Sequence, residues 1–273
     1  MSATSTLAAA VGPLRADVAR AAVLLDVDGT LAPIVRHADD AHVPEATRLP
    51  LIAIAKRYGL VACVSGRQAA VARRIVSLGS ISYVGNHGAE LLRGGATEVE
   101  PDAEMDAWAA RVGAFVEEAW TDELQRLRVR HEDKDAIVGL HWRGAPDEEA
   151  AAAAVSDVAA QAEAAGLITH WGRKVLEVRP PVAMHKGKGI ERLLRTYGTD
   201  IRTAVYAGDD RTDLDAFATL RELRGAGRLD VVLCVGVRHD EMPEALEEQA
   251  DLLVEGTAGV RELLSALAEP EPA

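Results

Sequence analysis

The stretch VLLDVDGTL occupies residues 23–31, where apolar residues predict a short buried strand that ends in Asp26 and Asp28. Side chains two positions apart on a strand point to the same face, so we expect these carboxylates to converge. Buried like charges are costly unless a cation or a reaction uses them. Gly29 then lets the backbone turn tightly beside a ligand. The pattern therefore predicts a partner that is doubly cationic, phosphoryl-bearing, or both.

Two plainer interpretations of Asp26 and Asp28 are that they solvate a loop or that they cap a helix. A calcium-binding loop of the pattern D-x-[DN]-x-[DN]-G is disfavoured, because Gly29 directly follows the second acid and a strand precedes the pair. Further polar clusters after other expected strands favour a functional role.

The composition is that of an ordinary globular protein, since the 273 residues are 48% hydrophobic and 27% charged. With 43 acidic and 30 basic residues the net charge is −13, so we expect neither a nucleic-acid nor a membrane partner. We find no signal-peptide pattern and no apolar run of membrane-spanning length, and we expect a cytoplasmic protein. Cys63 and Cys234 stand in apolar runs and are expected to be buried hydrophobic residues.

Strands and helices alternate in the first and last parts of the chain, which is typical of a parallel sheet flanked by helices. We expect residues 1–12 to form a loose tail. The expected strands are residues 23–27, 60–64, 81–84, 203–207, 230–235 and 252–254. The expected helices are residues 14–21, 44–58, 68–77 and 188–197, helices that begin near 213 and 243, and residues 260–267.

The pattern changes between Gly94-Gly95 and Pro180-Pro181, where an α+β insert is expected. Its expected elements are a helix at 101–126, a hairpin of strands at 127–132 and 136–142, an Ala-rich helix at 147–165, and strands at 167–171 and 174–179. We therefore predict a Rossmann-like α/β core of residues 1–100 and 181–273. The inserted cap comprises residues 101–180.

Two further clusters could bind phosphate, at the strand ends where open α/β sheets bind ligands. Ser65 follows the strand at 60–64, and its hydroxyl can donate to phosphate, although it could also cap a helix. The Gly66 amide and the Arg67 guanidinium can donate in the same way. Lys186 stands just before a helix and offers a point charge to phosphoryl oxygens, although a lone lysine is usually solvated surface.

Three acids, Asp209, Asp210 and Asp213, follow the strand expected at 203–207. Such a group at a strand-to-helix junction suits a hard divalent cation with oxygen ligands, which means magnesium before zinc. A helix cap with favourable helix-dipole charges explains one or two of these acids but not all three.

These four clusters resemble, in residue type and order, the four motifs of the haloacid dehalogenase-like phosphatases, and the insert between the second and third resembles the α/β-capped branch of that superfamily. Within it the chain is similar to the trehalose-6-phosphate phosphatases. That family's patterns G-x-H-G-x-E, E-x-K…H-x-R and E-x-R-P match residues 85–90, 132–143 and 177–180. Leu214 departs from the pattern, because the family usually has Glu there, and this bears on specificity or rate more than on reaction class.

The resemblance implies Mg²⁺-dependent hydrolysis of trehalose 6-phosphate through an aspartyl-phosphate. It implies that Asp26 is the nucleophile, that Asp28 is the general acid and then the base, and that Lys186 clamps the phosphoryl group. The implied phosphate ligands are Thr30, Ser65, Gly66, Arg67 and Lys186. The implied metal ligands, direct or through water, are Asp26, Asp28 (by its backbone carbonyl), Asp209, Asp210 and Asp213. The implied sugar ligands are His87, Glu90, Glu132, Lys134, His141, Arg143, Lys174 and Glu177.

Other functions remain open. The chain could act on another sugar phosphate, such as mannosyl- or glucosyl-phosphoglycerate or sucrose phosphate, or it could be a phosphomutase. It could also be a non-catalytic partner of a trehalose-phosphate synthase. We expect a monomer with a functional link to such a synthase. A dehydrogenase or kinase is disfavoured, because no G-x-G-x-x-G or G-x-x-x-x-G-K-[ST] pattern follows an expected strand.

Overall fold

The computed structural model describes residues 3–35, 40–134, 136–182 and 185–270. For residues 3–6 and Lys134 it describes the backbone only. The chain divides into two compact units. The core unit comprises Met1–Glu100 and Met184–Ala273, and the insert unit comprises Pro101–Ala183. Within the described ranges, none of the helices combines the length and the apolar character that crossing a membrane requires.

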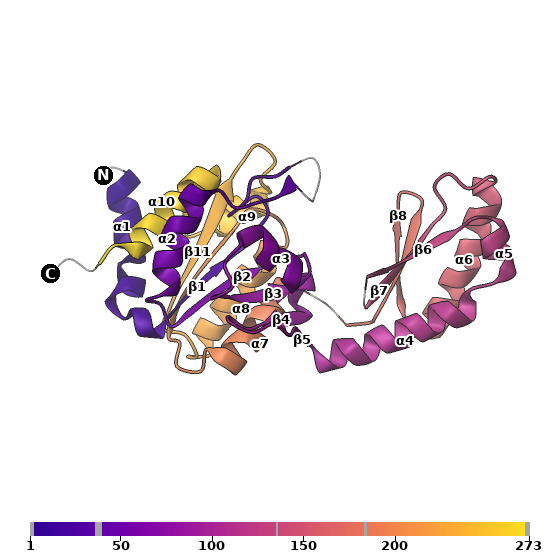
Figure 1. Cartoon of the computed structure of the whole chain (residues 1–273), viewed down its shortest axis with the longest axis horizontal. Coiled ribbons are helices and arrows are strands. Elements are labelled where there is room, and N and C mark those ends of the chain that lie inside the picture. Colours follow the sequence, from indigo (N-terminus) through magenta and orange to yellow (C-terminus); the bar gives the residue numbers. More distant parts are fainter. Residues whose placement is uncertain (1–2, 36–39, 135, 183–184, 271–273) are drawn as a thin grey trace. The chain divides into compact units, whose positions relative to one another are not determined.

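The described part of the core unit contains an eight-stranded sheet in the order β12-β11-β10-β1-β2-β3-β4-β5. Figure 1 shows β1, β2 and β3 of this sheet next to one another. Neighbouring strands from β12 to β3 pair in parallel, and β4 runs antiparallel to β3. The strands are β1 (Ala21–Leu25), β2 (Leu60–Val64), β3 (Ser82–Gly85), β4 (Glu90–Leu92), β5 (Glu100–Pro101), β10 (Thr203–Gly208), β11 (Val231–Arg238) and β12 (Leu252–Glu255).

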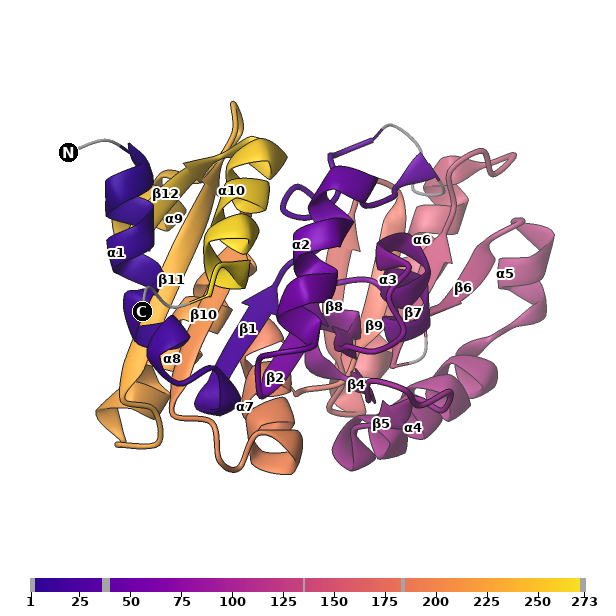
Figure 2. The same ribbon diagram turned by 60° about the vertical axis from the view of Figure 1, so that its left-hand side comes forward.

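Helices cover both faces of this sheet (Figure 2). One face carries α1 (Ala3–Ala16), α2 (Glu45–Ala55), α3 (Ala69–Val76) and α10 (Gly256–Ala268). The other carries α7 (Lys186–Tyr197), α8 (Asp213–Gly225) and α9 (Glu244–Gln249). Alternate residues of β1 enter the two hydrophobic clusters, Val23 the first and Leu24 the second. The predicted α/β class is confirmed, and Cys63 and Cys234 are buried, as expected.

The amino-terminal expectations were wrong, because α1 spans Ala3–Ala16, whereas a loose tail was predicted at 1–12 and a helix at 14–21, where β1 already begins at Ala21. Val11 and Leu14 on this helix are fully buried, and they join the same hydrophobic cluster as residues of α10. Tertiary packing thus stabilises an alanine-rich helix that contains Pro13.

The described residues of the insert unit form a four-stranded antiparallel sheet in the order β6-β7-β9-β8, with helices packed against it. The strands are β6 (Arg130–Lys134), β7 (Ile137–His141), β8 (Ile168–Gly172) and β9 (Val175–Arg179). The helices are α4 (Ala103–Ala119), α5 (Asp122–Arg126) and α6 (Glu148–Ala164). The single helix expected at 101–126 is therefore two, and the break falls at Thr121, whose hydroxyl accepts the Leu124 amide and caps α5.

Candidate active site

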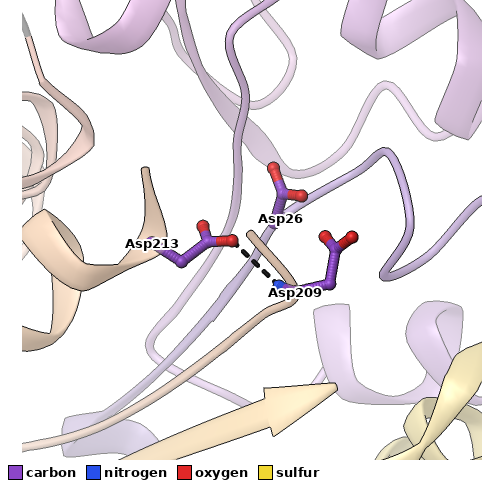
Figure 3. Close-up of side chains that lie close together, drawn as sticks. All are labelled: Asp26, Asp209 and Asp213. Carbon is purple, nitrogen blue, oxygen red and sulfur yellow. Dashed lines mark hydrogen bonds between the residues drawn. The ribbon is translucent and has the colours of Figure 1, made fainter. Parts of the chain in front are cut away.

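Three buried carboxylates meet beyond the carboxyl ends of β1 and β10. Asp26 follows β1, Asp209 follows β10, and Asp213 begins α8 (Figure 3). Each offers a carboxylate oxygen within 4.8 Å of the others, and among the described residues no second group of acids, histidines or cysteines is so arranged. Parallel strands end at one edge of a sheet, so residues far apart in the sequence come together here.

The Lys186 ammonium lies between two of these acids. Its Nζ is 2.8 Å from Asp26 Oδ1 and 2.7 Å from Asp213 Oδ1, and all three side chains are nearly inaccessible to water. Asp210, which is more exposed, has its carboxylate 4.0 Å from the same ammonium. Lys186 is the first residue of α7, so its position is fixed by the start of a helix packed on the sheet.

Both oxygens of Asp213 are already engaged by protein donors. Oδ2 accepts the backbone N–H groups of Asp209 and Asp210, each at 2.9 Å, and the first of these bonds is drawn in Figure 3. Oδ1 accepts from Lys186 and from the hydroxyl of Tyr206. Asp213 therefore shapes the loop after β10 and holds Lys186, whereas Asp26 and Asp209 are freer to contact a ligand.

The acids of this cluster are difficult to ionise together. Burial raises the pKa of Asp26 well above its usual range, and the Lys186 ammonium offsets only part of that effect. Burial and then the charge of Asp213 raise the pKa of Asp209 to about 6. Burial lowers the pKa of Lys186, but the charges of Asp26 and Asp213 outweigh it and raise that pKa overall. The ammonium therefore stays charged.

A divalent cation fits this arrangement. When all three carboxylates are ionised, they exceed the one ammonium by two negative charges, which a divalent cation would balance. The donors are all carboxylate oxygens, the ligand type that Mg²⁺ prefers. The carboxylates of Asp26 and Asp209 point the same way in Figure 3.

Gly29 and Thr30 turn the chain closely around Asp209. Thr30 Oγ1 donates to Asp209 Oδ1 at 3.2 Å. A Cβ atom on Gly29 would lie 1.9 Å from Asp209 Oδ2, and Gly29 has a φ of +79°, which side chains disfavour. No larger residue fits at this position without moving the acid.

Asp28 does not join the buried carboxylates, although its spacing from Asp26 predicted convergence. The Arg67 guanidinium holds it through two hydrogen bonds, from Nε to Oδ2 at 2.7 Å and from Nη2 to Oδ1 at 2.8 Å. The alternation argument failed here because β1 ends at Leu25 and the chain turns at once. Arg67, which was predicted to bind phosphate, is thus committed to Asp28 in this structure.

The loop after β2 presents Ser65 and Gly66 at the same edge of the sheet. Ser65 is buried, and its Oγ accepts the Arg67 amide at 3.1 Å while its carbonyl accepts the His87 amide at 3.2 Å. A Cβ atom on Gly66 would lie 2.7 Å from the His87 ring, so the two residues are closely apposed.

Glu90 has a structural position that the sequence did not indicate. One of its oxygens accepts the Ala69 amide at the start of α3, and the other accepts the Asn86 side-chain amide, each at 2.7 Å. Asn86 and His87 both have positive φ, at 46° and 53°. Glu90, predicted to bind sugar, thus braces the loops that follow β2 and β3.

The insert unit places three of the predicted sugar ligands on neighbouring strands. Glu132 on β6 and Glu177 on β9 both pair in register with Gly139 on β7, so they flank a position that has no side chain. His141 Nε2 lies 3.0 Å from Glu132 Oε2, and Glu177 pairs with Arg179. The side chain of Lys134 lies outside the described residues.

Arg143 and Lys174 contact a different part of the insert unit. Arg143 donates to the Arg173 carbonyl at 3.1 Å, and Lys174 forms an ion pair with Glu148 at the start of α6. These contacts lie around the β8–β9 turn.

Two residues that bond to the site were absent from the sequence prediction. Tyr206 lies inside the apolar strand β10, and nothing in the sequence singles it out. His239 directly follows β11, and its Nε2 lies 3.1 Å from the Asp209 carbonyl oxygen. The position after a strand, which identified Asp209, could have identified His239 as well.

Comparison with known proteins identifies the family. The trehalose-phosphatase family model matches residues 24–248. A probable trehalose-phosphate phosphatase of Oryza sativa subsp. japonica is 32% identical over 213 residues, which cover 75% of this chain and 56% of that protein. A trehalose 6-phosphate phosphatase of Zea mays is 32% identical over 266 residues, which cover 92% of this chain and 70% of that protein.

A solved structure of Aspergillus fumigatus trehalose-6-phosphate phosphatase has the same fold, with a TM-score of 0.65 at 24% identity over 97% of each chain. The chain spans little more than half the length of the rice relative. The family model nevertheless covers most of the chain, including the buried acids and Lys186. This chain belongs to the trehalose-phosphatase family.

Proposed function

We propose that this protein is a Mg²⁺-dependent phosphatase that hydrolyses trehalose 6-phosphate to trehalose and phosphate. The observation that supports this most is the environment of Asp26, a buried carboxylate held by Lys186 at 2.8 Å beside Asp209. A carboxylate so placed can act as a nucleophile toward phosphorus. The substrate is inferred from the family and from the rice and maize relatives.

Asp26, Asp209 and the Asp28 backbone carbonyl would hold the Mg²⁺ ion, and Asp210 and Asp213 would bind its water ligands or Lys186. When bound, the ion supplies the positive charge that lowers the repulsion between a carboxylate and a phosphate dianion. Ser65, Thr30 and the Gly66 amide are the proposed donors to phosphoryl oxygens, together with Lys186.

The reaction then has two displacements. An Asp26 carboxylate oxygen forms a bond to phosphorus, the bond from phosphorus to the sugar oxygen breaks, and Asp28 gives that oxygen a proton. Water next attacks the phosphorus of the aspartyl-phosphate and loses a proton to Asp28. This step releases phosphate and restores the Asp26 carboxylate.

The pairing of Asp28 with Arg67 places a condition on this mechanism. Both carboxylate oxygens of Asp28 accept from the guanidinium, so the acid has no proton available to a leaving group in this arrangement. Asp28 must exchange at least one of these bonds before it can transfer a proton. Arg67 would then be able to donate to the substrate phosphate.

The insert unit is proposed to bind the sugar. Glu132 and Glu177 flank Gly139 in register, and the His141 ring lies close to this glycine, so two carboxylates and an imidazole are available to hydroxyl groups. Sites that hydrogen-bond a substrate hydroxyl reject analogues that lack it. Lys134, His141, Arg143 and Lys174 remain predicted sugar ligands on the strength of the family resemblance.

The function is tested by measuring free phosphate from a panel of sugar phosphates, with Mg²⁺ and with a chelator. We expect release from trehalose 6-phosphate, abolished by the chelator and by Asp26→Asn. Release from sucrose phosphate or a glycosyl-phosphoglycerate instead would support the proposed phosphatase mechanism but reject trehalose 6-phosphate as the substrate. Absence of metal-dependent release from every compound would reject the enzyme in favour of a non-catalytic partner.

Leu214 occupies the position where the family usually has Glu, and it packs against the hydrophobic cluster beneath α7 and α8. Unlike glutamate, leucine carries no charge, so Leu214 adds none to the acidic part of the chain around Asp213. We therefore expect the substitution to alter rate more than mechanism. The monomeric state and the link to a trehalose-phosphate synthase remain predictions.

A further inference from the structure

His239 stands at the carboxyl edge of the sheet beside Asp209. It directly follows β11, whose Gly236 pairs with Gly208, the residue before Asp209. The His239 Nε2 atom is 3.1 Å from the Asp209 carbonyl oxygen and 3.4 Å from its Oδ2. The imidazole is about one quarter exposed, whereas the Asp209 carboxylate is nearly inaccessible. The histidine therefore covers the outer side of the acid.

The hydrogen bonds of the ring define which nitrogen carries the proton. The backbone N–H of Glu241 lies 3.2 Å from His239 Nδ1, and an amide N–H can only donate. Nδ1 is therefore the acceptor and Nε2 carries the proton. Both neighbours of Nε2 are acceptor oxygens of Asp209. The Met242 amide also donates to the His239 carbonyl at 3.1 Å, so a closed turn holds the ring in place.

A donor near Asp209 stabilises its charged form, because other acids lie close to it. The carboxylates of Asp26 and Asp213 lie within the same cluster. Thr30 donates to Asp209 Oδ1 at 3.2 Å, and His239 faces Oδ2. Thr30 thus holds one carboxylate oxygen, while His239 holds the Asp209 backbone through its carbonyl and lies next to the other carboxylate oxygen.

We propose that His239 is a positioning residue that orients Asp209 and thereby increases the affinity of the site for a divalent cation. The proposal rests on the metal-dependent function proposed above. Partners that hydrogen-bond to a metal ligand orient it, and their loss typically weakens metal binding about 10- to 100-fold. His239 acts through Asp209 and does not itself contact the ion or the substrate.

The test is a titration of the metal-free protein with Mn²⁺, followed by the electron paramagnetic resonance signal of the free ion. His239→Ala should raise the dissociation constant about 10- to 100-fold. His239→Gln, whose amide nitrogen can replace Nε2, should stay within a few-fold of the wild type. The matched control is His42→Ala, since His42 is an exposed histidine of the same unit that bonds to the Asp40 carbonyl.

A second readout separates positioning from a general loss of structure. With saturating Mg²⁺, kcat of His239→Ala should return to within a few-fold of the wild type, and its melting temperature without metal should match that of His42→Ala. Wild-type binding retained in His239→Ala would overturn the proposal, as would a His239→Gln variant as weak as His239→Ala. A wild-type protein that binds no Mn²⁺ would reject the metal-dependent function itself, and the role of His239 with it.

Discussion

The guanidinium of Arg67 donates to both carboxylate oxygens of Asp28, at 2.7 and 2.8 Å. Such a two-point bond between planar groups is a strong and well-oriented ion pair. The pair lies beside the buried cluster but stays outside it, with Asp28 about one third exposed. The proposed nucleophile and the proposed acid thus have different environments, and two carboxylates two residues apart can serve different steps.

Replacing Asp28 should affect the two displacement steps to different extents, depending on the leaving group of the substrate. Asp28→Asn should lower phosphate release from trehalose 6-phosphate about 10²- to 10⁴-fold, the usual contribution of a general acid or base. With p-nitrophenyl phosphate, whose leaving group needs no proton, the first step should survive while the second is slow. A stopped-flow trace should therefore show a burst of one equivalent of nitrophenolate.

The matched control for that experiment is Asp215→Asn, since Asp215 is an exposed acid on α8. This variant should turn over both substrates as the wild type does. Equal losses on the two substrates in Asp28→Asn, with no burst, would contradict the assignment of Asp28 to proton transfer.

Lys186 should contribute to stability as well as to chemistry. Lys186→Met leaves Asp26 and Asp213 buried without a counter-charge, and loss of one partner of a buried ion pair costs about 3 kcal/mol. Urea unfolding in the presence of a chelator should show that decrease in the free energy of unfolding. Lys188→Met, two residues along and exposed, should change stability little. Similar unfolding curves for both variants would show that the buried pair is not a stabilising contact.

Gly29 allows a test of how closely Asp209 must be held. Gly29→Ala and Gly95→Ala place a methyl group on backbones of similar φ, +79° and +83°, so both should be destabilised by about 1–2 kcal/mol. Only at Gly29 does the new Cβ collide with Asp209, whereas at Gly95 no atom lies within 4 Å. Gly29→Ala should therefore lose at least about tenfold in Mn²⁺ affinity and in activity. An equal loss in both variants would mean that backbone strain, and not the acid, is responsible.

The sequence was sufficient to predict the parallel sheet and the positions of the acids after its strands. Alternation of apolar strands and helices is a local pattern, and parallel strands always end at one edge. For this reason the sequence could predict that Asp26, Asp209 and Lys186 lie close together. The same rule applied to β11 would have found His239.

The features that could not be predicted from the sequence depend on contacts between segments that are distant in the chain. The partner of Asp28 is Arg67, which a strand-alternation argument cannot select because the strand has already ended. Helix α1 is stabilised by burial of Val11 and Leu14 in the core, and these tertiary contacts cannot be identified from the local sequence. The role of Glu90 as a brace likewise follows from two loops that meet only in the folded chain.

The most direct test of the central claim is to trap the phosphoryl group on Asp26. The protein is mixed with trehalose 6-phosphate and Mg²⁺, quenched in acid within the first turnover, digested with trypsin and analysed by mass spectrometry. The account predicts one phosphoryl group on the peptide of residues 21–36, which contains both Asp26 and Asp28, and none in Asp26→Asn. Phosphate release from trehalose 6-phosphate by the Asp26→Asn variant, or a phosphoryl group on another peptide, would contradict it.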